Sequence, residues 1–185
     1  MNFLVEVLTK EIAIKKEIDS FIKILLFSFL TFFGSLVKIF LPFTPVPVTL
    51  QTFFLFMAVY YLNPKEIGVS QSIYILAGMV GLPVFAAGLT GMLALVGPTA
   101  GYLLGFIIAG IIMAIIREKI KVTFFKIFCT FLLGIMIVYL FGIAHLCFIY
   151  KINIITAVKI GAIPFIAGDL IKISLASIAS LKIKK

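Results

Sequence analysis

The chain has 185 residues, of which 63% are hydrophobic and 12% are charged. Uncharged stretches at 39–64, 67–116 and 127–150 could each cross a bilayer, so the composition indicates an integral membrane protein. It excludes a soluble enzyme and a nucleic-acid-binding domain, which need charged outer faces. The net charge of +9 must therefore be explained in terms of the membrane.

The first segment of the chain differs from the rest because it is rich in charge. Acidic and basic residues lie four positions apart at Glu6/Lys10 and Glu11/Lys15, which favours a short amphipathic helix at 1–20. A solvated tail remains an equal alternative. The apolar run at 21–40 is too long for the core of a signal peptide and lacks a small-residue cleavage pattern, so we expect a retained first membrane span.

Prolines and glycines divide the remaining apolar sequence into segments. The glycine-rich stretch at 82–98 is expected to be a partly inserted loop covered by protein, and a short peripheral helix is expected at Ile154–Gly161. The other segments predict five further spans, at 48–62, 67–81, 101–116, 124–146 and 164–181. We therefore predict an all-α integral membrane protein with six transmembrane helices in a single membrane domain, 1–185.

The orientation in the membrane follows from the 16 lysine and arginine residues. Six spans place both termini on one side, and that side would hold 12 of these residues, whereas the other side would hold three. Because short cytoplasmic loops collect basic residues, we expect both termini to be cytoplasmic. The proline loop, the glycine loop and the 147–163 connection then face outward. The positive charge needs no nucleic-acid partner, and we expect a multi-pass protein of the cell membrane.

The remaining basic residue lies inside the sixth predicted span. Lys172 follows Asp169 by three positions, which puts both side chains on one helix face. A charge in hydrocarbon costs several kcal/mol unless it is paired or hydrated, and such residues usually mark a ligand path. Together they offer an anion site and an acceptor for N–H donors. A pair that only fixes helix packing remains the alternative.

Other polar residues carry weaker signals. His145, the only histidine, is expected to be a packing or interfacial residue. Ser28, Thr31 and Ser35 share one face of the first predicted span and permit close approach of another helix, either from this chain or from a partner. Phosphate-loop, zinc-protease and nucleophile-elbow motifs are absent from the sequence, so we expect no metal site and no catalytic residues, and an ATP-driven process would need another chain.

Several sequence blocks occur together in a fixed order. They are Pro42-Phe-Thr-Pro-Val-Pro-Val-Thr-Leu-Gln-Thr-Phe, Asn63-Pro-Lys, Gly81-Leu-Pro-Val-Phe, Gly97-Pro-Thr-Ala-Gly-Tyr-Leu and Pro164-Phe-Ile-Ala-Gly-Asp-Leu-Ile-Lys. From about Ser28 to Leu181 the chain resembles the BioY family, the biotin-specific substrate-binding (S) components of energy-coupling factor (ECF) transporters. This resemblance implies the six-helix S-component fold.

The resemblance also implies roles for individual residues. Asp169 and Lys172 match the aspartate and lysine that contact the vitamin in that family. In the glycine loop, Gly88 and Thr90 stand where family members carry more glycine and a polar ligand-binding residue. Ser28, Thr31 and Ser35 replace the alanines with which family members dock to a transmembrane partner.

The implied function is high-affinity capture of biotin from outside the cell. A transmembrane coupling subunit and two ATP-binding-cassette ATPases would then drive its import, with ATP used by these partners alone and no cofactor or chemical reaction on this chain. Two alternatives stay open. The ligand could be another small carboxylate vitamin such as lipoate, or the chain could be a small membrane enzyme with Asp169 and Lys172 as an acid/base pair. A channel is disfavoured, because only one charged pair is available.

Overall fold

The computed structural model describes residues 2–88, 90–91 and 93–183, and this part of the chain is almost entirely helical. Two very short strands, β1 (Lys38–Ile39) and β2 (Val48–Thr49), form an antiparallel hairpin around the predicted proline loop. A 3-10 turn at Ile163–Phe165 precedes the last helix. The helices are α1 (Asn2–Leu36), α2 (Gln51–Tyr61), α3 (Pro64–Met79), α4 (Leu93–Val96), α5 (Ala100–Lys119), α6 (Phe124–Tyr150), α7 (Ile154–Gly161) and α8 (Ile166–Ile183).

The all-α prediction is confirmed, and the peripheral helix expected at Ile154–Gly161 is α7. Among the described residues, four helical segments are long and apolar enough to cross a membrane: 14–36, 100–119, 124–150 and 154–182. The predicted spans at 48–62 and 67–81 form α2 and α3, of 11 and 16 residues. Both are shorter than the roughly 20 residues of an ordinary span.

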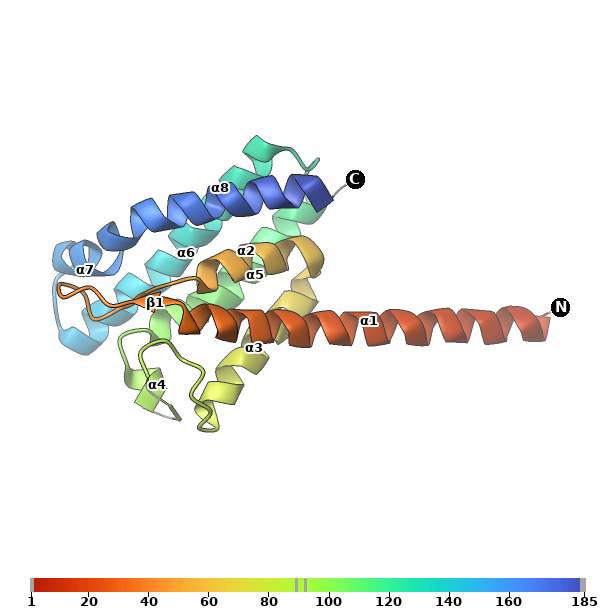
Figure 1. Cartoon of the computed structure of the whole chain (residues 1–185), viewed down its shortest axis with the longest axis horizontal. Coiled ribbons are helices and arrows are strands. Elements are labelled where there is room, and N and C mark those ends of the chain that lie inside the picture. The colour runs from red at the N-terminus through yellow and green to blue at the C-terminus, as the bar shows by residue number, and fades with distance from the viewer. Residues whose placement is uncertain (1, 89, 92, 184–185) are drawn as a thin grey trace.

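The N-terminal part of the chain corrects one expectation. Residues 2–20 form neither a separate short helix nor a tail, because they continue without a break into the first predicted span as α1. At 1.5 Å per residue this 35-residue helix is about 52 Å long. Figure 1 shows its N-terminal half projecting beyond the rest of the bundle. The helix ends at Leu36, before the predicted limit of 40, since Lys38 and Ile39 pair with β2.

Glycines allow α5 and α6 to pack closely at the centre of the bundle. A Cβ atom added at Gly101 would lie 2.4 Å from the carbonyl oxygen of Phe141, and one added at Gly105 would lie 2.9 Å from Cα of Val138. Small residues four positions apart therefore bring the two backbones into contact, as is common between membrane helices. Beside this pair, Phe56 of α2 stacks on Phe131 of α6 with ring centroids 4.9 Å apart.

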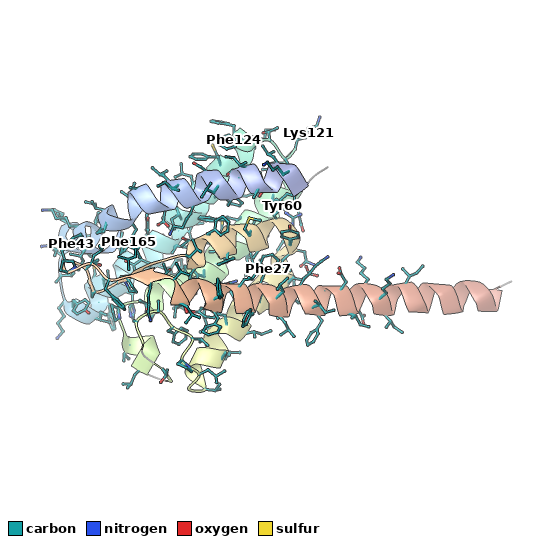
Figure 2. The ribbon with its side chains drawn as sticks, in the orientation of Figure 1. Phe27, Phe43, Tyr60, Lys121, Phe124 and Phe165 are labelled. Atoms are coloured by element: carbon teal, nitrogen blue, oxygen red, sulfur yellow. The ribbon has the colours of Figure 1, made fainter. Side chains whose placement is uncertain are left out.

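The two ends of the bundle differ. The N-terminus and the C-terminus lie at the same end, and the hairpin and α7 lie at the other (Figure 1). Figure 2 shows Lys121 in the α5–α6 turn near the end with the termini, and Phe43 of the hairpin loop at the opposite end. The structure thus separates the basic α5–α6 turn from the loops that were expected to face outward.

Candidate functional site

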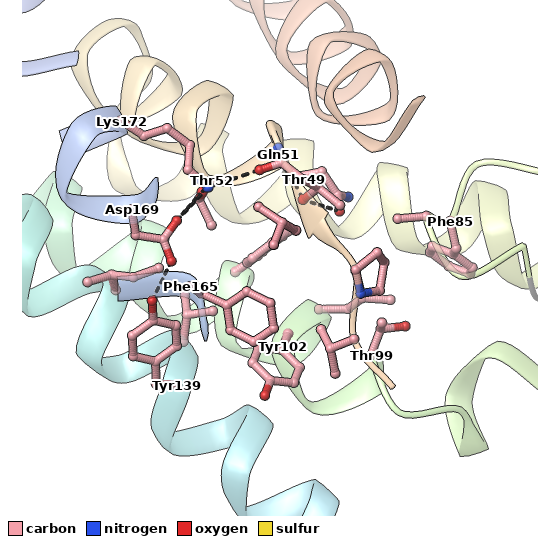
Figure 3. Close-up of a pocket in the computed structure, with 18 residues that line it drawn as sticks. Thr49, Gln51, Thr52, Phe85, Thr99, Tyr102, Tyr139, Phe165, Asp169 and Lys172 are labelled. Carbon is pink, nitrogen blue, oxygen red and sulfur yellow. Dashed lines mark hydrogen bonds and ion pairs between the residues drawn. The ribbon is translucent and has the colours of Figure 1, made fainter. Parts of the chain in front are cut away.

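A cavity lies between the hairpin, the loop after α3, and helices α2, α5, α6 and α8 (Figure 3). The empty space between these elements is about 580 Å³, and this value includes open solvent at the mouth of the cavity. The cavity is lined by Val46, Pro47, Val48, Thr49, Gln51, Thr52, Phe85, Ala86, Thr99, Tyr102, Leu103, Phe106, Ile135, Val138, Tyr139, Phe165, Asp169 and Lys172.

The start of α8 carries the charged pair into this cavity. Pro164 sits in the 3-10 turn, where its missing N–H leaves no partner unsatisfied, and it leads directly into the helix. Asp169 then falls in the first turn of α8. Phe165, Asp169 and Lys172 follow at helical spacing of four and three residues, and all three line the cavity.

Asp169 and Lys172 form a buried ion pair. The Lys172 Nζ atom lies 2.5 Å from Oδ1 of Asp169, and the two residues are 9% and 4% exposed. Lys172 Nζ also donates to the Thr52 hydroxyl at 2.8 Å and to the Thr49 carbonyl at 2.9 Å. The ammonium group therefore has a partner for each of its three N–H bonds, which is the condition for tolerating a buried charge.

The carboxylate of Asp169 is bonded on both oxygens. Oδ1 accepts from the Thr52 hydroxyl at 3.0 Å as well as from Lys172, and Oδ2 accepts from the Tyr139 hydroxyl. Helices α2, α6 and α8 thus meet at this one side chain. Such hydrogen bonds hold the carboxylate in a fixed orientation.

Aromatic and aliphatic side chains form most of the remaining wall, which also includes Thr49, Gln51 and Thr99. The Tyr102 hydroxyl donates to the Gly161 carbonyl at 2.7 Å. Figure 3 shows Asp169, Lys172 and Tyr139 on one side of the cavity and Phe85 and Thr99 on the other. The cavity is therefore polar at one end and mainly apolar at the other, which suits an amphipathic small molecule.

Two of the four predicted ligand-binding residues lie at this cavity. Asp169 and Lys172 line it, whereas Gly88 and Thr90 do not, because the loop after α3 contributes Phe85 and Ala86 instead. Gly88 has a φ of +76°, so it serves a turn that favours glycine. The expectation that Gly88 and Thr90 bind the ligand has no support from the cavity lining.

The three residues predicted to dock a partner are buried. Ser28, Thr31 and Ser35 are 8%, 0% and 1% exposed. Thr31 accepts a hydrogen bond from Gln71 of α3 at 3.2 Å, and Ser35 donates to the Val84 carbonyl at 2.7 Å. The close approach is therefore to the chain's own α3 and to the loop after it. In this structure the three side chains offer no surface to a partner.

Thr52 and Tyr139 are the site residues that the sequence did not single out. Thr52 lies within the proline-rich block, which also contains Thr44 and Thr49, and Tyr139 lies in an uncharged span. Their spacing from Asp169, 117 and 30 residues, gives no periodic signal. His145, expected to be a packing residue, contacts the carbonyl of Gly97 at 3.0 Å. Within the described residues there is no cluster of metal-ligating side chains.

Comparisons with known proteins agree with this architecture. The family model of the BioY family matches residues 8–185. The chain is 39% identical to the "Biotin transporter BioY" of Thermotoga maritima, over 89% of this chain and 95% of that protein. It is 34% identical to the "Probable biotin transporter BioY" of Bacillus subtilis, over 81% of each.

A solved structure, the "S-component for biotin from an ECF-type ABC transporter", has the same fold. It superposes with a TM-score of 0.85 at 24% identity and covers 92% of this chain and 93% of that one. The match of the family model over nearly the whole chain and the two similar relatives point the same way: the chain belongs to the BioY family.

Proposed function

We propose that this protein is the biotin-binding S component of an ECF-type vitamin uptake transporter. The observation that carries the proposal is the buried Asp169–Lys172 pair on the wall of a mainly apolar cavity, in a chain of the BioY family. The relatives named as biotin transporters support biotin as the ligand. Family membership also favours a transporter over a membrane enzyme that uses the same pair as acid and base.

The chemistry of biotin complements the cavity. Its ureido ring offers two N–H donors and a carbonyl, its bicycle and chain are apolar, and its tail is a carboxylate. The polar end of the cavity supplies an acceptor in Asp169 and donors in Lys172 and Tyr139. These buried groups are already bonded to one another and to Thr49 and Thr52, so a ligand can take up their hydrogen bonds only if it offers matching donors and acceptors in exchange, which discriminates between ligands.

The energy for uptake comes from other subunits. The sequence contains no phosphate-binding loop, so ATP hydrolysis belongs to two ATP-binding-cassette ATPases that act through a transmembrane coupling subunit. The similarity to an S component of an ECF-type transporter supports these partners. In this scheme the protein captures biotin outside the cell and its partners drive release inside.

The same proposal fixes the arrangement in the cell membrane. Six helices, α1, α2, α3, α5, α6 and α8, cross it as a single membrane domain with both termini in the cytoplasm. The basic residues at the end with the termini support this orientation. Helix α2 is short, but Leu55, Phe56 and Val59 are fully buried, so neighbouring helices shield it from lipid. The cavity then lies toward the outer face, beside the hairpin.

Binding of radiolabelled biotin to the detergent-purified chain tests the ligand. We expect saturable binding that unlabelled biotin competes away and that excess lipoate or thiamine does not. Asp169→Asn leaves Lys172 without its counter-charge, and Lys172→Ala does the converse, so each should weaken binding by roughly 100-fold or more. Lys159→Ala, an exposed lysine on α7, is the matched control and should bind like wild type.

The outcomes of this assay separate the alternatives. Competition by lipoate in place of biotin would show that the ligand is a different carboxylate vitamin. No saturable biotin binding by a folded wild-type chain would refute the proposal. Retained affinity in both site variants would show that the charged pair serves packing instead.

A further inference from the structure

The loop after α3 forms part of the cavity wall although most of its chain is exposed. Val80 and Leu82 are 80% and 52% exposed, whereas Val84, Phe85 and Ala86 are buried at 8%, 3% and 5%. Phe85 and Ala86 line the cavity. The segment 80–88 therefore turns inward at Val84, and some interaction must hold it there.

The carbonyl oxygen of Val84 accepts two buried hydrogen bonds. Ser35 of α1 donates its hydroxyl at 2.7 Å, and Tyr74 of α3 donates its hydroxyl at 3.0 Å. Both donors are 1% exposed. Water cannot easily replace such bonds, so each one restrains the backbone directly before Phe85. Two separate helices thus fasten the loop at one atom.

The hydrogen bonds continue from Tyr74 to the charged pair. Gln51 Nε2 donates to the Tyr74 hydroxyl at 2.6 Å, and the Gln51 side-chain oxygen accepts from the Thr49 hydroxyl at 3.2 Å. The Thr49 carbonyl in turn accepts from Lys172. Figure 3 shows Thr49 and Gln51 between the charged pair and Phe85. The loop and the polar end of the cavity therefore share one connected set of bonds.

Packing around Phe85 fits the same arrangement. Its ring meets the Tyr74 ring edge-on, with centroids 5.7 Å apart and planes at 85°. A Cβ atom added at Gly78 would lie 2.1 Å from the Phe85 ring, so the missing side chain at Gly78 makes room for Phe85. The hydroxyl of Tyr74 and its ring thus act on neighbouring parts of the loop.

We propose that Tyr74 and Ser35 are positioning residues that hold segment 80–88 closed against the cavity through the Val84 carbonyl, and that this contact sets how fast a bound ligand leaves. The claim about the rate of ligand release rests on the proposed function, whereas the claim that Tyr74 and Ser35 hold the segment does not. Tyr74 and Ser35 lie outside the cavity lining, so they act on the ligand through Phe85 and Ala86.

Cysteine labelling tests the loop without any ligand. In a chain with Cys129→Ser and Cys147→Ser, an Ala86→Cys reporter should react slowly with a water-soluble maleimide. Tyr74→Phe keeps the ring and removes one hydrogen bond, and Ser35→Ala removes the other. Each should speed labelling by roughly tenfold, and the double variant should speed it further because the carbonyl loses both partners.

Two controls distinguish a local effect from general loosening. Tyr60→Phe makes the same chemical change near the far end of α2 and should leave labelling at position 86 unchanged. The native Cys147, half-buried near the end of α6, should label at the wild-type rate in every variant of a Cys129→Ser chain. Unchanged labelling at position 86, or equal acceleration at Cys147, would overturn the proposal.

Ligand kinetics test the consequence. In the otherwise native chain, Tyr74→Phe should raise the dissociation rate of biotin by about tenfold and change the association rate by less than about twofold. Equal dissociation rates in variant and wild type would refute this part of the proposal. Failure of the wild type to bind biotin would instead refute the proposed function, and the labelling result would still decide the role of Tyr74 and Ser35.

Discussion

Replacing Gly101 with alanine should force α5 and α6 apart. The new Cβ would lie 2.4 Å from the Phe141 carbonyl oxygen and 2.4 Å from Cβ of His145. Ordinary contacts begin near 3.4 Å, so the helices must separate by about 1.0 Å at this level. Neither contact is the flexible end of a side chain, and the strain cannot be relieved by a change of rotamer alone.

The size of the effect follows from this overlap. Overpacking of a well-packed core costs about 1–3 kcal/mol. For a chain of this length each kcal/mol lowers the melting temperature by roughly 2–4 °C, which gives a decrease of about 2–12 °C. Tyr102 and Leu103, next to Gly101, line the cavity, so biotin affinity should fall as well.

Gly168→Ala is the matched control, because it makes the same change near the start of α8, beside the cavity-lining Asp169. A Cβ atom added there meets nothing within 4 Å. Alanine is the better helix former by about 1 kcal/mol, so this variant should be as stable as wild type or more so. Thermal unfolding in detergent, monitored by fluorescence-detected gel filtration, gives the melting temperatures of the Gly101→Ala and Gly168→Ala variants. Equal melting temperatures for the two variants would refute the reasoning about close helix packing.

Two further predictions use the same preparations. Tyr139→Phe removes one hydrogen bond to the buried Asp169 carboxylate and should weaken biotin binding by roughly tenfold or more in the radioligand assay. An affinity within about twofold of wild type would show that Tyr139 is dispensable. The orientation can be tested in whole cells with a chain that carries Cys129→Ser and Cys147→Ser. In this background a membrane-impermeant maleimide should label a Phe43→Cys reporter and should not label a Lys121→Cys reporter. The reverse pattern would contradict cytoplasmic termini.

The helical segments were largely predictable because they depend on local sequence. Charge-free runs ended by proline or glycine mark most of the helices, and α7 was predicted with its observed limits. The continuity between residues 1–20 and the first span was not predictable, since paired charges are compatible with a surface helix, a tail or a continuous helix. No breaking residue separates the two, and the structure keeps them as one helix.

The site was predictable only where charge revealed it. Asp169 and Lys172 stood out because each is a charge in an apolar span. Thr52 and Tyr139 were missed because hydroxyl groups are common in membrane helices and their role depends on which helices meet. The contact that Ser35 makes could not be predicted for the same reason, since the Val84 carbonyl that accepts its hydrogen bond lies 49 residues away in a loop.

The pairing of Asp169 with Lys172 also has an electrical consequence. The paired charges of Asp169 and Lys172 cancel, so in the proposed transport cycle this pair makes the return of the empty cavity across the membrane field insensitive to voltage. A bound carboxylate adds one negative charge, and carrying it to the negative interior costs about 2.3 kcal/mol per 100 mV if it crosses the whole field. In the proposed transport cycle the membrane potential therefore opposes the loaded step and spares the empty return.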